Sequence, residues 1–160
     1  MEYHIRSAAQ SDVKSIVELW KEMFDLHKER DSHFTRSSDG HENYEKLINE
    51  GLASDDYHIL VAETDKKIIG YCLANVAKYP PSFELKEYGA IFDLSVTRNY
   101  RRKSLGEKLL KEAYNWFSKK GIKRIEARVA TSNDISQKFW RKMGFAPYME
   151  ILFLEKNMTE

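Results

Sequence analysis

The stretch with the clearest capacity for chemistry is residues 91–106, where an apolar segment leads through a basic one into a helical pattern. Residues 91–96 are apolar except at Asp93 and Ser95, and residues 98–103 include three arginines and one lysine. A helix that begins at Leu105 presents unpaired backbone N–H groups and a partial positive charge to this segment, and Gly106 allows close approach of a ligand. The pattern predicts an anion-binding site, while a solvated charged turn is the alternative that spacing alone leaves open.

Other motifs that bind phosphates or metals are missing from the sequence. A phosphate loop needs two glycines and a Lys-Ser/Thr pair, and the glycine pattern of dinucleotide-binding folds is also absent. The single cysteine, Cys72, cannot form a zinc cage, and His27, His33 and His41 are too widely spaced for a local metal motif. We therefore expect no metal ion.

Periodicity predicts the elements that position this stretch. Apolar residues recur at helical spacing over residues 13–24 and 105–117, and Gly121 follows the second helix as a C-cap. Further helices are expected over residues 41–52 and 133–143. Strands are expected over residues 3–6, 57–63, 68–76, 90–96, 122–129 and 145–154. This order predicts an α/β (α+β) fold in which helices cover a central sheet.

Length and composition restrict the class of protein. A chain of 160 residues is one ordinary domain, here residues 1–160. Lys+Arg is 26 and Asp+Glu is 25, and this net charge of +1 argues against a nucleic-acid-binding domain. The N-terminus has no apolar signal-peptide core, and the longest nearly apolar run, residues 68–77, is about half of a membrane span. We expect a soluble, cytoplasmic protein that binds neither nucleic acid nor membrane.

The basic loop and the last predicted helix together resemble two motifs of the GNAT N-acetyltransferase superfamily. The first, Arg101-Arg102-Lys103-Ser104-Leu105-Gly106, is similar to Arg/Gln-x-x-Gly-x-Gly/Ala after a strand. The second, residues 133–145, resembles an Asn-x-x-Ala/Ser helix that ends in Gly-Phe before a final strand. The gap between the motifs fits one helix and one strand, as in the family. The resemblance implies the GNAT acyl-CoA N-acyltransferase fold, with a mixed, mostly antiparallel, twisted sheet flanked by helices.

The resemblance also implies acetyl-CoA as co-substrate. The edge of the strand at Leu94, Ser95 and Val96 would pair with the pantetheine arm, because an open edge templates an extended partner. Asn133 would hydrogen-bond the arm. The residues implied for the pyrophosphate are Arg101, Arg102, Lys103, Ser104, Leu105, Gly106 and Glu107, and those implied for the thioester end are Ser136, Phe139 and Trp140.

Two positions depart from the family pattern. Ser104 stands where the family has its first Gly, so it is strained if that position needs a positive φ, and its hydroxyl is a candidate phosphate donor if it does not. Trp140 stands where many members carry a Tyr that protonates the leaving thiolate, and an indole N–H is no usable acid near neutral pH. A thiolate of pKa about 8.5 can leave without a strong acid. Tyr100 and Tyr148 are open substitutes, with packing as their alternative role.

The implied reaction is direct acyl transfer, in which an amine attacks the thioester carbonyl, a tetrahedral intermediate forms and CoA thiolate leaves. We expect the Val96 N–H to stabilise the oxyanion. Asp93 is the best candidate for the base that deprotonates the amine, because it lies in an otherwise apolar strand beside the expected thioester site. Its alternative role is to anchor a structural hydrogen-bond network, and Glu63 is a weaker candidate base.

We therefore predict an N-acetyltransferase that moves the acetyl group of acetyl-CoA to a primary amine, with a small amine as the favoured acceptor. The alternative is a CoA-binding sensor or interaction module without catalysis, which Trp140 keeps open. Members of the family are often dimers through their last strands. A homodimer through Phe145, Tyr148 and Phe153 is thus an expectation of the resemblance.

Overall fold

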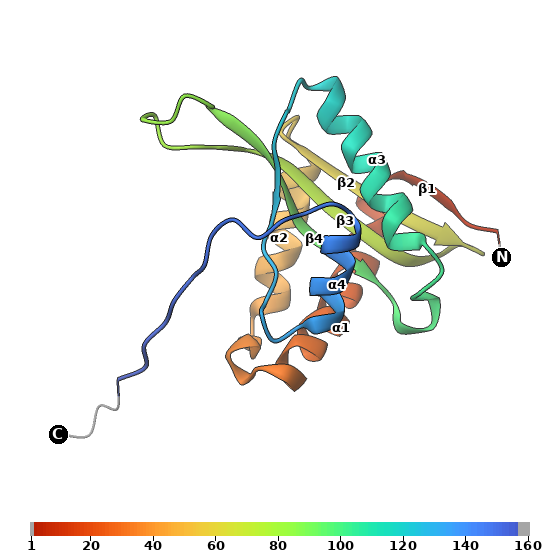
Figure 1. Ribbon diagram of the computed structural model, residues 1–160. Helices are drawn as coiled ribbons and strands as arrows, with labels where there is room; N and C mark the ends of the chain where they lie inside the picture. Colours follow the sequence, from red (N-terminus) through yellow and green to blue (C-terminus); the bar gives the residue numbers. More distant parts are fainter. Residues whose placement is uncertain (1, 157–160) are drawn as a thin grey trace.

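A computed structural model describes residues 2–156, which form one five-stranded sheet and four α-helices (Figure 1). The strands are β1 His4–Ser7, β2 Tyr57–Thr64, β3 Lys67–Lys78, β4 Glu87–Val96 and β5 Ile125–Ala127. The helices are α1 Val13–Arg30, α2 Gly40–Leu52, α3 Leu105–Lys119 and α4 Asp134–Lys142. Short 3-10 turns lie at Gln10–Asp12, Ser32–Phe34 and Arg98–Tyr100.

The sheet has the strand order β1-β2-β3-β4-β5, so strands that follow one another in the chain are neighbours in space. The first three pairs are antiparallel. β4 and β5 are parallel, because α3 carries the chain back across the sheet between them. The prediction of a mixed, mostly antiparallel sheet flanked by helices is confirmed.

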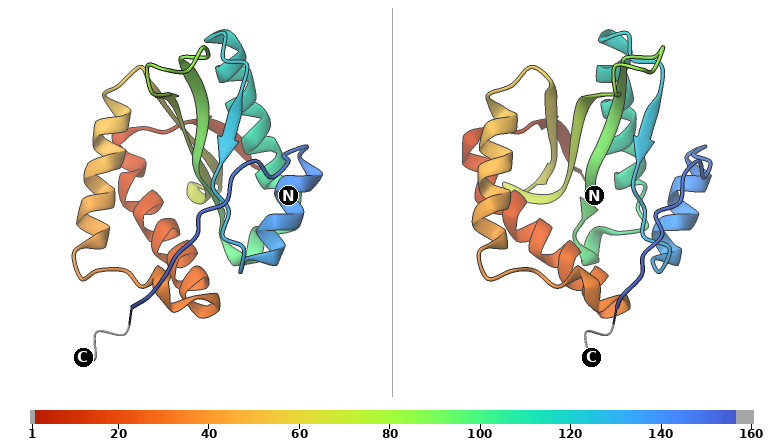
Figure 2. Two further views of the ribbon diagram at one scale, coloured as in Figure 1. Left: turned by 60° about the vertical axis from the view of Figure 1, so that its left-hand side comes forward. Right: turned by 90° about the vertical axis from the view of Figure 1, so that its left-hand side faces the viewer.

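Helices cover both faces of the sheet (Figure 2). α1 and α2 pack on one face, where the core includes Ile16, Ile48 and Tyr71. α3 and α4 pack on the other, where the core includes Leu109 and Cys72. Because successive side chains of a strand alternate between faces, β3 contributes to both cores. None of the described helices is long and apolar enough to cross a bilayer.

The two ends of α3 follow from the sequence pattern. The apolar stripe of the helix is buried at Leu105, Leu109 and Phe117. Gly121 has a φ of +72°, and the N–H of Ile122 donates to the carbonyl of Phe117 at 3.0 Å. This left-handed glycine ends the helix as predicted, so the amphipathic stripe and the C-cap together fix where α3 stops.

The predicted final strand is wrong, because residues 145–156 form no strand. The fifth strand is also shorter than residues 122–129, since β5 pairs with β4 at only three positions, from Gly89–Ile125 to Ile91–Ala127. The segment after α4 leaves the body of the molecule (Figure 1), and Leu152 and Phe153 are 85% and 86% exposed. A segment rich in apolar and aromatic residues has the composition of a strand, but residues 145–156 pair with none of the five strands.

Candidate active site

β4 parts from β5 beyond Ile91, so from Phe92 onward its outer edge has no strand beside it within the described structure. A bulge marks the separation. Asp93 pairs with Leu73 and Ile91 pairs with Ala74, which leaves Phe92 without a partner on β3. The result is a short open edge that can accept an extended ligand.

The main-chain groups of β4 alternate between this open edge and β3. The N–H of Thr97 donates to Ile69 O at 2.9 Å, which fixes the alternation at the end of the strand. Ser95 therefore turns its main-chain groups toward β3, whereas Leu94 and Val96 turn theirs toward the open edge. Of the three edge residues predicted to meet the pantetheine arm, Leu94 and Val96 thus face the opening and Ser95 does not.

The loop between β4 and α3 turns at two residues with positive φ. Arg102 and Ser104 both have a φ of 59°, in the left-handed region that residues with a side chain rarely adopt. Ser104 therefore stands at a position suited to glycine, and of the two alternatives for this residue the strained conformation is the one found. The loop accommodates this strain where it leads into α3.

The start of α3 offers unpaired donors. Lys108 N–H donates to Ser104 O at 3.1 Å, whereas the N–H groups of Leu105, Gly106 and Glu107 have no acceptor among residues 2–156. Lys103 stands beside these donors and lines a hollow of about 260 Å³ beneath the loop. Free N–H groups at a helix start next to cationic side chains can bind an anionic group such as a phosphate.

The side chain of Arg101 holds the loop through hydrogen bonds and does not project into solvent. Its Nε donates to Val96 O at 2.8 Å and its Nη2 lies 3.2 Å from Glu22 Oε1. Glu22, on α1, also accepts hydrogen bonds from the Thr97 hydroxyl and the Arg98 N–H, each at 2.9 Å. Because Arg101 occupies Val96 O, the group of Val96 left for a ligand is its N–H. Sequence analysis missed Glu22, which gave no signal within its helical pattern.

α4 lies against the start of α3. Asn133 accepts a hydrogen bond from Ser136 N–H at 3.1 Å and so caps α4. Phe139 approaches Gly106, where an added Cβ would lie 3.6 Å from its ring. Trp140 is 9% exposed and packs edge-on against Phe139 at a centroid distance of 5.3 Å, so this residue belongs to the core.

Asp93 lies on the face of the sheet covered by α1 and α2, in a cluster with two tyrosines. Tyr44, from α2, donates a hydrogen bond to Asp93 Oδ2 at 2.6 Å. The hydroxyls of Tyr44 and Tyr71, the latter from β3, are 3.0 Å apart. The ring of Trp20, from α1, stacks on Tyr44 at 4.6 Å. Residues from four elements thus form the cluster that contains this carboxyl group.

The surroundings of Asp93 bring its pKa near neutrality. Burial raises the pKa from 3.8 to about 7, because the carboxylate loses hydration, and the hydroxyls of Tyr44 and Tyr71 partly offset this rise. Burial also raises the pKa of both tyrosines well above 10, so they remain neutral hydroxyls. A carboxyl group with a pKa near 7 can both take up and release a proton at neutral pH.

The two tyrosines of this cluster were not predicted. The polar residue in an apolar strand pointed to Asp93, but nothing in the sequence linked it to α2. Alternation along residues 68–76 was a usable signal for Tyr71, since it puts Tyr71 and Leu73 on one face. Tyr44 lies on the buried side of a weak helical pattern, where a tyrosine and a plain core residue look alike.

Other candidate acids and bases lie elsewhere. Glu63 accepts a hydrogen bond from Arg6 Nε at 2.8 Å on the β1–β2 side of the sheet, two strands from β4. Tyr148 is exposed and lies under Arg124, 4.4 Å from its guanidinium. Tyr100 lies in the loop before α3, below Lys103. None of the three is part of the Asp93 cluster.

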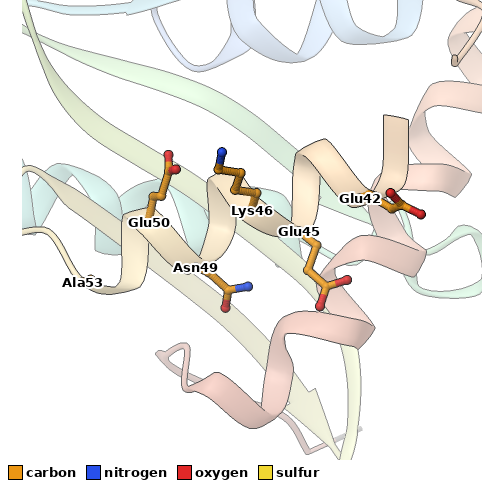
Figure 3. Close-up of a pocket in the computed structure, with 6 residues that line it drawn as sticks. All are labelled: Glu42, Glu45, Lys46, Asn49, Glu50 and Ala53. Atoms are coloured by element: carbon orange, nitrogen blue, oxygen red, sulfur yellow. The ribbon is translucent and has the colours of Figure 1, made fainter. Parts of the chain in front are cut away.

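A shallow hollow of about 670 Å³ on α2 lies outside this site (Figure 3). Asn49, one of its lining residues, accepts a hydrogen bond from Gln10 at 2.7 Å. Its lining shares no residue with the loop or with the Asp93 cluster. The lining residues of the hollow are Glu42, Glu45, Lys46, Asn49, Glu50 and Ala53.

In residues 2–156 no group of three or more His, Cys, Asp or Glu side chains is arranged to hold a metal ion.

Solved structures share this fold over nearly the whole chain. A mutant protein from Bacillus halodurans has a TM-score of 0.87 at 19% identity, covering 96% of this chain and 99% of that one. An aminoglycoside 6'-N-acetyltransferase from Acinetobacter haemolyticus has a TM-score of 0.76 at 20% identity, covering 98% and 99%. At these identities the likeness establishes the fold alone.

Sequence relatives point to one family. An uncharacterised N-acetyltransferase of Methanocaldococcus jannaschii is 22% identical over 143 residues, which are 89% of this chain and 60% of that protein. A putative ribosomal protein bS18-alanine N-acetyltransferase of Bacillus subtilis is 27% identical over 103 residues, 64% of this chain and 63% of that protein. The chain thus spans less than two thirds of the length of either relative. The sequence pattern of the Acetyltransferase (GNAT) family matches residues 15–145, which contain both motifs, and the chain belongs to this family.

Proposed function

We propose that this protein binds acetyl-CoA along β4 and the start of α3 and transfers the acetyl group to a primary amine. The observation that carries the proposal is that β4 holds both halves of such a reaction. Its open edge begins at Phe92 and leads to the free N–H groups of α3, while the side chain of Asp93, next to the same bulge, points to the face of the sheet that α1 and α2 cover. Acetyl-CoA would supply the acetyl group as a reactive thioester.

Binding would use main-chain groups first. Leu94 would pair with the pantetheine arm through the open edge, whereas Val96 has only its N–H to offer there, because Arg101 occupies its carbonyl. The N–H groups of residues 105–107 would hold the pyrophosphate, and Arg102 and Lys103 would add charge around it. Arg101 would act indirectly, since its side chain is engaged with Val96 and Glu22.

The chemical step would use two groups of β4. Val96 N–H would donate to the thioester carbonyl oxygen as negative charge grows there. Asp93 would take the proton that keeps the amine from attacking, because a lysine-like amine of pKa about 10.4 is mostly charged at pH 7. With a pKa of about 7, Asp93 is half ionised near neutral pH and can return the proton afterwards.

The acceptor we favour is a small primary amine. The names of the relatives cover the amine of a protein alanine and an amine of an aminoglycoside, and both are primary amines. The structural neighbours that act on aminoglycosides match this chain over nearly their full length. A small amine would fit a compact domain whose base lies between two helices and the sheet.

Calorimetry with acetyl-CoA tests the cofactor assignment. We expect saturable binding that Gly106→Glu weakens by about tenfold or more, because a carboxylate at the helix start opposes a phosphate there. Gly106→Ala is the matched control, since its Cβ would make only an ordinary contact of 3.6 Å with Phe139. Absence of saturable binding, or equal binding by the Glu variant, would refute the assignment.

Release of free thiol during a screen of primary amines tests catalysis. The panel should contain polyamines, aminoglycosides, amino acids and peptides with an N-terminal alanine. A second candidate function is a CoA-binding sensor. Trp140 is packed among aromatic rings and stands where many family members have an acidic Tyr hydroxyl, so the usual acid is absent. Tight acetyl-CoA binding with no thiol release across the panel would favour the sensor.

We also propose self-association through the segment after α4. Met149, Ile151 and Leu154 are exposed there together with Leu152 and Phe153, and such an apolar run is typical of an interface. Phe145, in contrast, packs on Trp140 and would not take part. Sedimentation equilibrium should give a dimer that Phe153→Asp converts to monomer; a monomeric wild type would refute this.

A further inference from the structure

Asp93 is held at only one of its two carboxylate oxygens. Tyr44 Oη donates to Oδ2 at 2.6 Å. No hydrogen bond reaches Oδ1 from within the described residues, yet Oδ1 is not among the fully buried polar atoms that lack a partner, which are Tyr3 Oη and Asn75 Oδ1. Asp93 is itself only partly buried, so Oδ1 is the oxygen that remains available to solvent or a substrate.

The carboxylate fixes the direction of the hydrogen bond between the two tyrosines. Tyr44 Oη and Tyr71 Oη are 3.0 Å apart, and on distance alone either can donate. Each hydroxyl has one proton, and Tyr44 uses its proton toward Asp93. Tyr71 therefore donates to Tyr44, and both protons point along one chain toward Oδ2.

This chain of hydroxyls has no outlet to solvent. Tyr71 is fully buried, and Tyr44 is 6% exposed beneath the ring of Trp20. A proton on Oδ2 would require the chain to reverse, and Tyr71 would then need an acceptor that the described residues do not supply. Loss of the Tyr71 proton is no alternative, since burial raises the pKa of this hydroxyl well above 10.

We propose that Tyr44 and Tyr71 are positioning residues, which keep Oδ2 as a hydrogen-bond acceptor in both protonation states and reserve Oδ1 for proton exchange with the amine. The inference rests on the proposed function, in which Asp93 is the base. In this step an N–H bond of the ammonium breaks and its electron pair stays on nitrogen. The proton binds Oδ1, and the carboxylate becomes a neutral acid. The proton then leaves from Oδ1, because the chain of tyrosine hydroxyls on the other oxygen has no outlet to solvent.

Charged side chains do not contribute to this arrangement in the described part of the chain. The titratable groups that face Asp93 are Tyr44 from α2 and Tyr71 from β3. Glu22, the acid of α1 that reaches β4, is bound at the loop. The pKa of about 7 thus reflects burial, which raises it, and two hydroxyls, which lower it. Removing either hydroxyl should raise the pKa of Asp93 further.

Carbon-13 NMR of the aspartate carboxyls in the full-length protein tests the proposal without any activity. The Asp93 signal is identified by its loss in Asp93→Asn. Tyr44→Phe should raise the Asp93 titration midpoint by about one pH unit, since a hydrogen bond to a charged group is lost. Tyr71→Phe should raise it by less, because Tyr71 acts through Tyr44. Tyr57→Phe is the matched control, since Tyr57 packs against the same core.

Kinetics then separates this inference from the proposed function. With an active acceptor, the acid limb of the pH profile of kcat/KM should shift to higher pH in Tyr44→Phe, by the same number of pH units that NMR records. The KM for acetyl-CoA should stay constant. An unchanged Asp93 titration in both Phe variants of an active enzyme overturns the inference alone. Full turnover in Asp93→Asn overturns the base assignment, and with it the role of Oδ1. If Tyr44→Phe does not fold, Tyr71→Phe supplies the same test.

Discussion

The loop before α3 and the Asp93 cluster meet on β4, yet their electrostatics are opposite. The loop carries exposed cations, Arg98, Arg102 and Lys103, around unpaired backbone N–H groups. The cluster holds one carboxyl group and two neutral hydroxyls, with no ion pair to Asp93 among residues 2–156. The cations of the loop are solvated, whereas the carboxyl group of Asp93 is desolvated.

This difference matches the needs of acyl transfer to an amine. A polyanionic ligand is attracted by solvated cations and must also be released, which salt screening allows. A base that works near neutral pH needs a pKa far above that of an ordinary carboxyl, which desolvation provides. Variants of the loop and of the cluster should therefore affect different properties of the protein.

The largest expected effect is on the pH dependence of stability through Asp93. Its pKa is about 7 in the folded protein and 3.8 in its ordinary state, so the folded protein binds more protons between these values. The stability that Asp93 contributes is therefore fully present below pH 4 and is lost as pH rises toward 7. At 1.36 kcal/mol per unit this amounts to about 4 kcal/mol. Denaturant unfolding should show the free energies of unfolding of wild type and Asp93→Asn diverging by that amount between pH 4 and 8.

Asp12→Asn provides a control of opposite sign. Hydrogen bonds from Arg6 lower the pKa of Asp12, so the stability it contributes is present above its ordinary pKa and is lost as pH falls. A difference between wild type and Asp93→Asn that stays flat across pH would mean that Asp93 is well solvated. The loop and the cluster would then not differ in the solvation of their charged groups.

The next effect concerns turnover. Asp93→Asn should lower kcat at pH 7 by about 10²-fold, because general-base catalysis typically contributes that much or more, while Tyr44 can still donate to the amide oxygen. The affinity for acetyl-CoA, measured by calorimetry, should stay the same, since the loop is untouched. Asp65→Asn, in the turn between β2 and β3, should change neither quantity. An equal loss of affinity and turnover would show that the two regions are not separable.

The loop was predictable from the sequence because its parts are contiguous. Residues 91–106 carry the strand, the basic segment and the helix start, and spacing alone places them together. The Asp93 cluster was not predictable in the same way. Tyr44, Tyr71 and Asp93 come from three elements, and only packing brings them together. The sequence predicted that Asp93 was exceptional but not which hydroxyls would meet it.

The fold shows the same division. The strongly periodic pattern of α3 predicted its bounds closely, and the weaker pattern over residues 41–52 also came close to the bounds of α2. The predicted final strand was wrong because the apolar and aromatic composition of residues 145–154 does not determine whether the segment pairs with the sheet. Ser104 falls between these cases. The motif marked it as a glycine position, and only the backbone could show that its φ is positive.

A smaller effect is expected at Glu22, which ties α1 to the loop. Glu22→Ala removes the acceptor for Thr97, Arg98 and Arg101, and hydrogen bonds to a charged group are each worth about 1.5–3 kcal/mol before solvent exposure is considered. Because this carboxylate is about one-third exposed, we expect a loss of about 1–2 kcal/mol in the free energy of unfolding. Acetyl-CoA affinity should also fall, since the loop loses its brace.

Glu18→Ala is the matched control for Glu22→Ala on the same helix. Its ion pair with Lys21 lies on the surface and should contribute almost nothing, so both stability and affinity should be preserved. Unchanged acetyl-CoA affinity in Glu22→Ala would show that the loop holds its shape without α1.

The smallest effect is expected at Ser104, and it distinguishes strain from ligand contact. Glycine adopts a φ of 59° without the penalty that serine meets, so Ser104→Gly should stabilise the fold by about 0.5–1 kcal/mol after the added entropy of the unfolded chain. Ser15→Gly, at an exposed helical position of α1, should instead destabilise it by a similar amount. If backbone N–H groups alone hold the pyrophosphate, acetyl-CoA affinity will not change in Ser104→Gly. A gain in stability with a tenfold loss of affinity would instead assign the serine hydroxyl to a phosphate oxygen, which would explain why a strained residue stands at a glycine position.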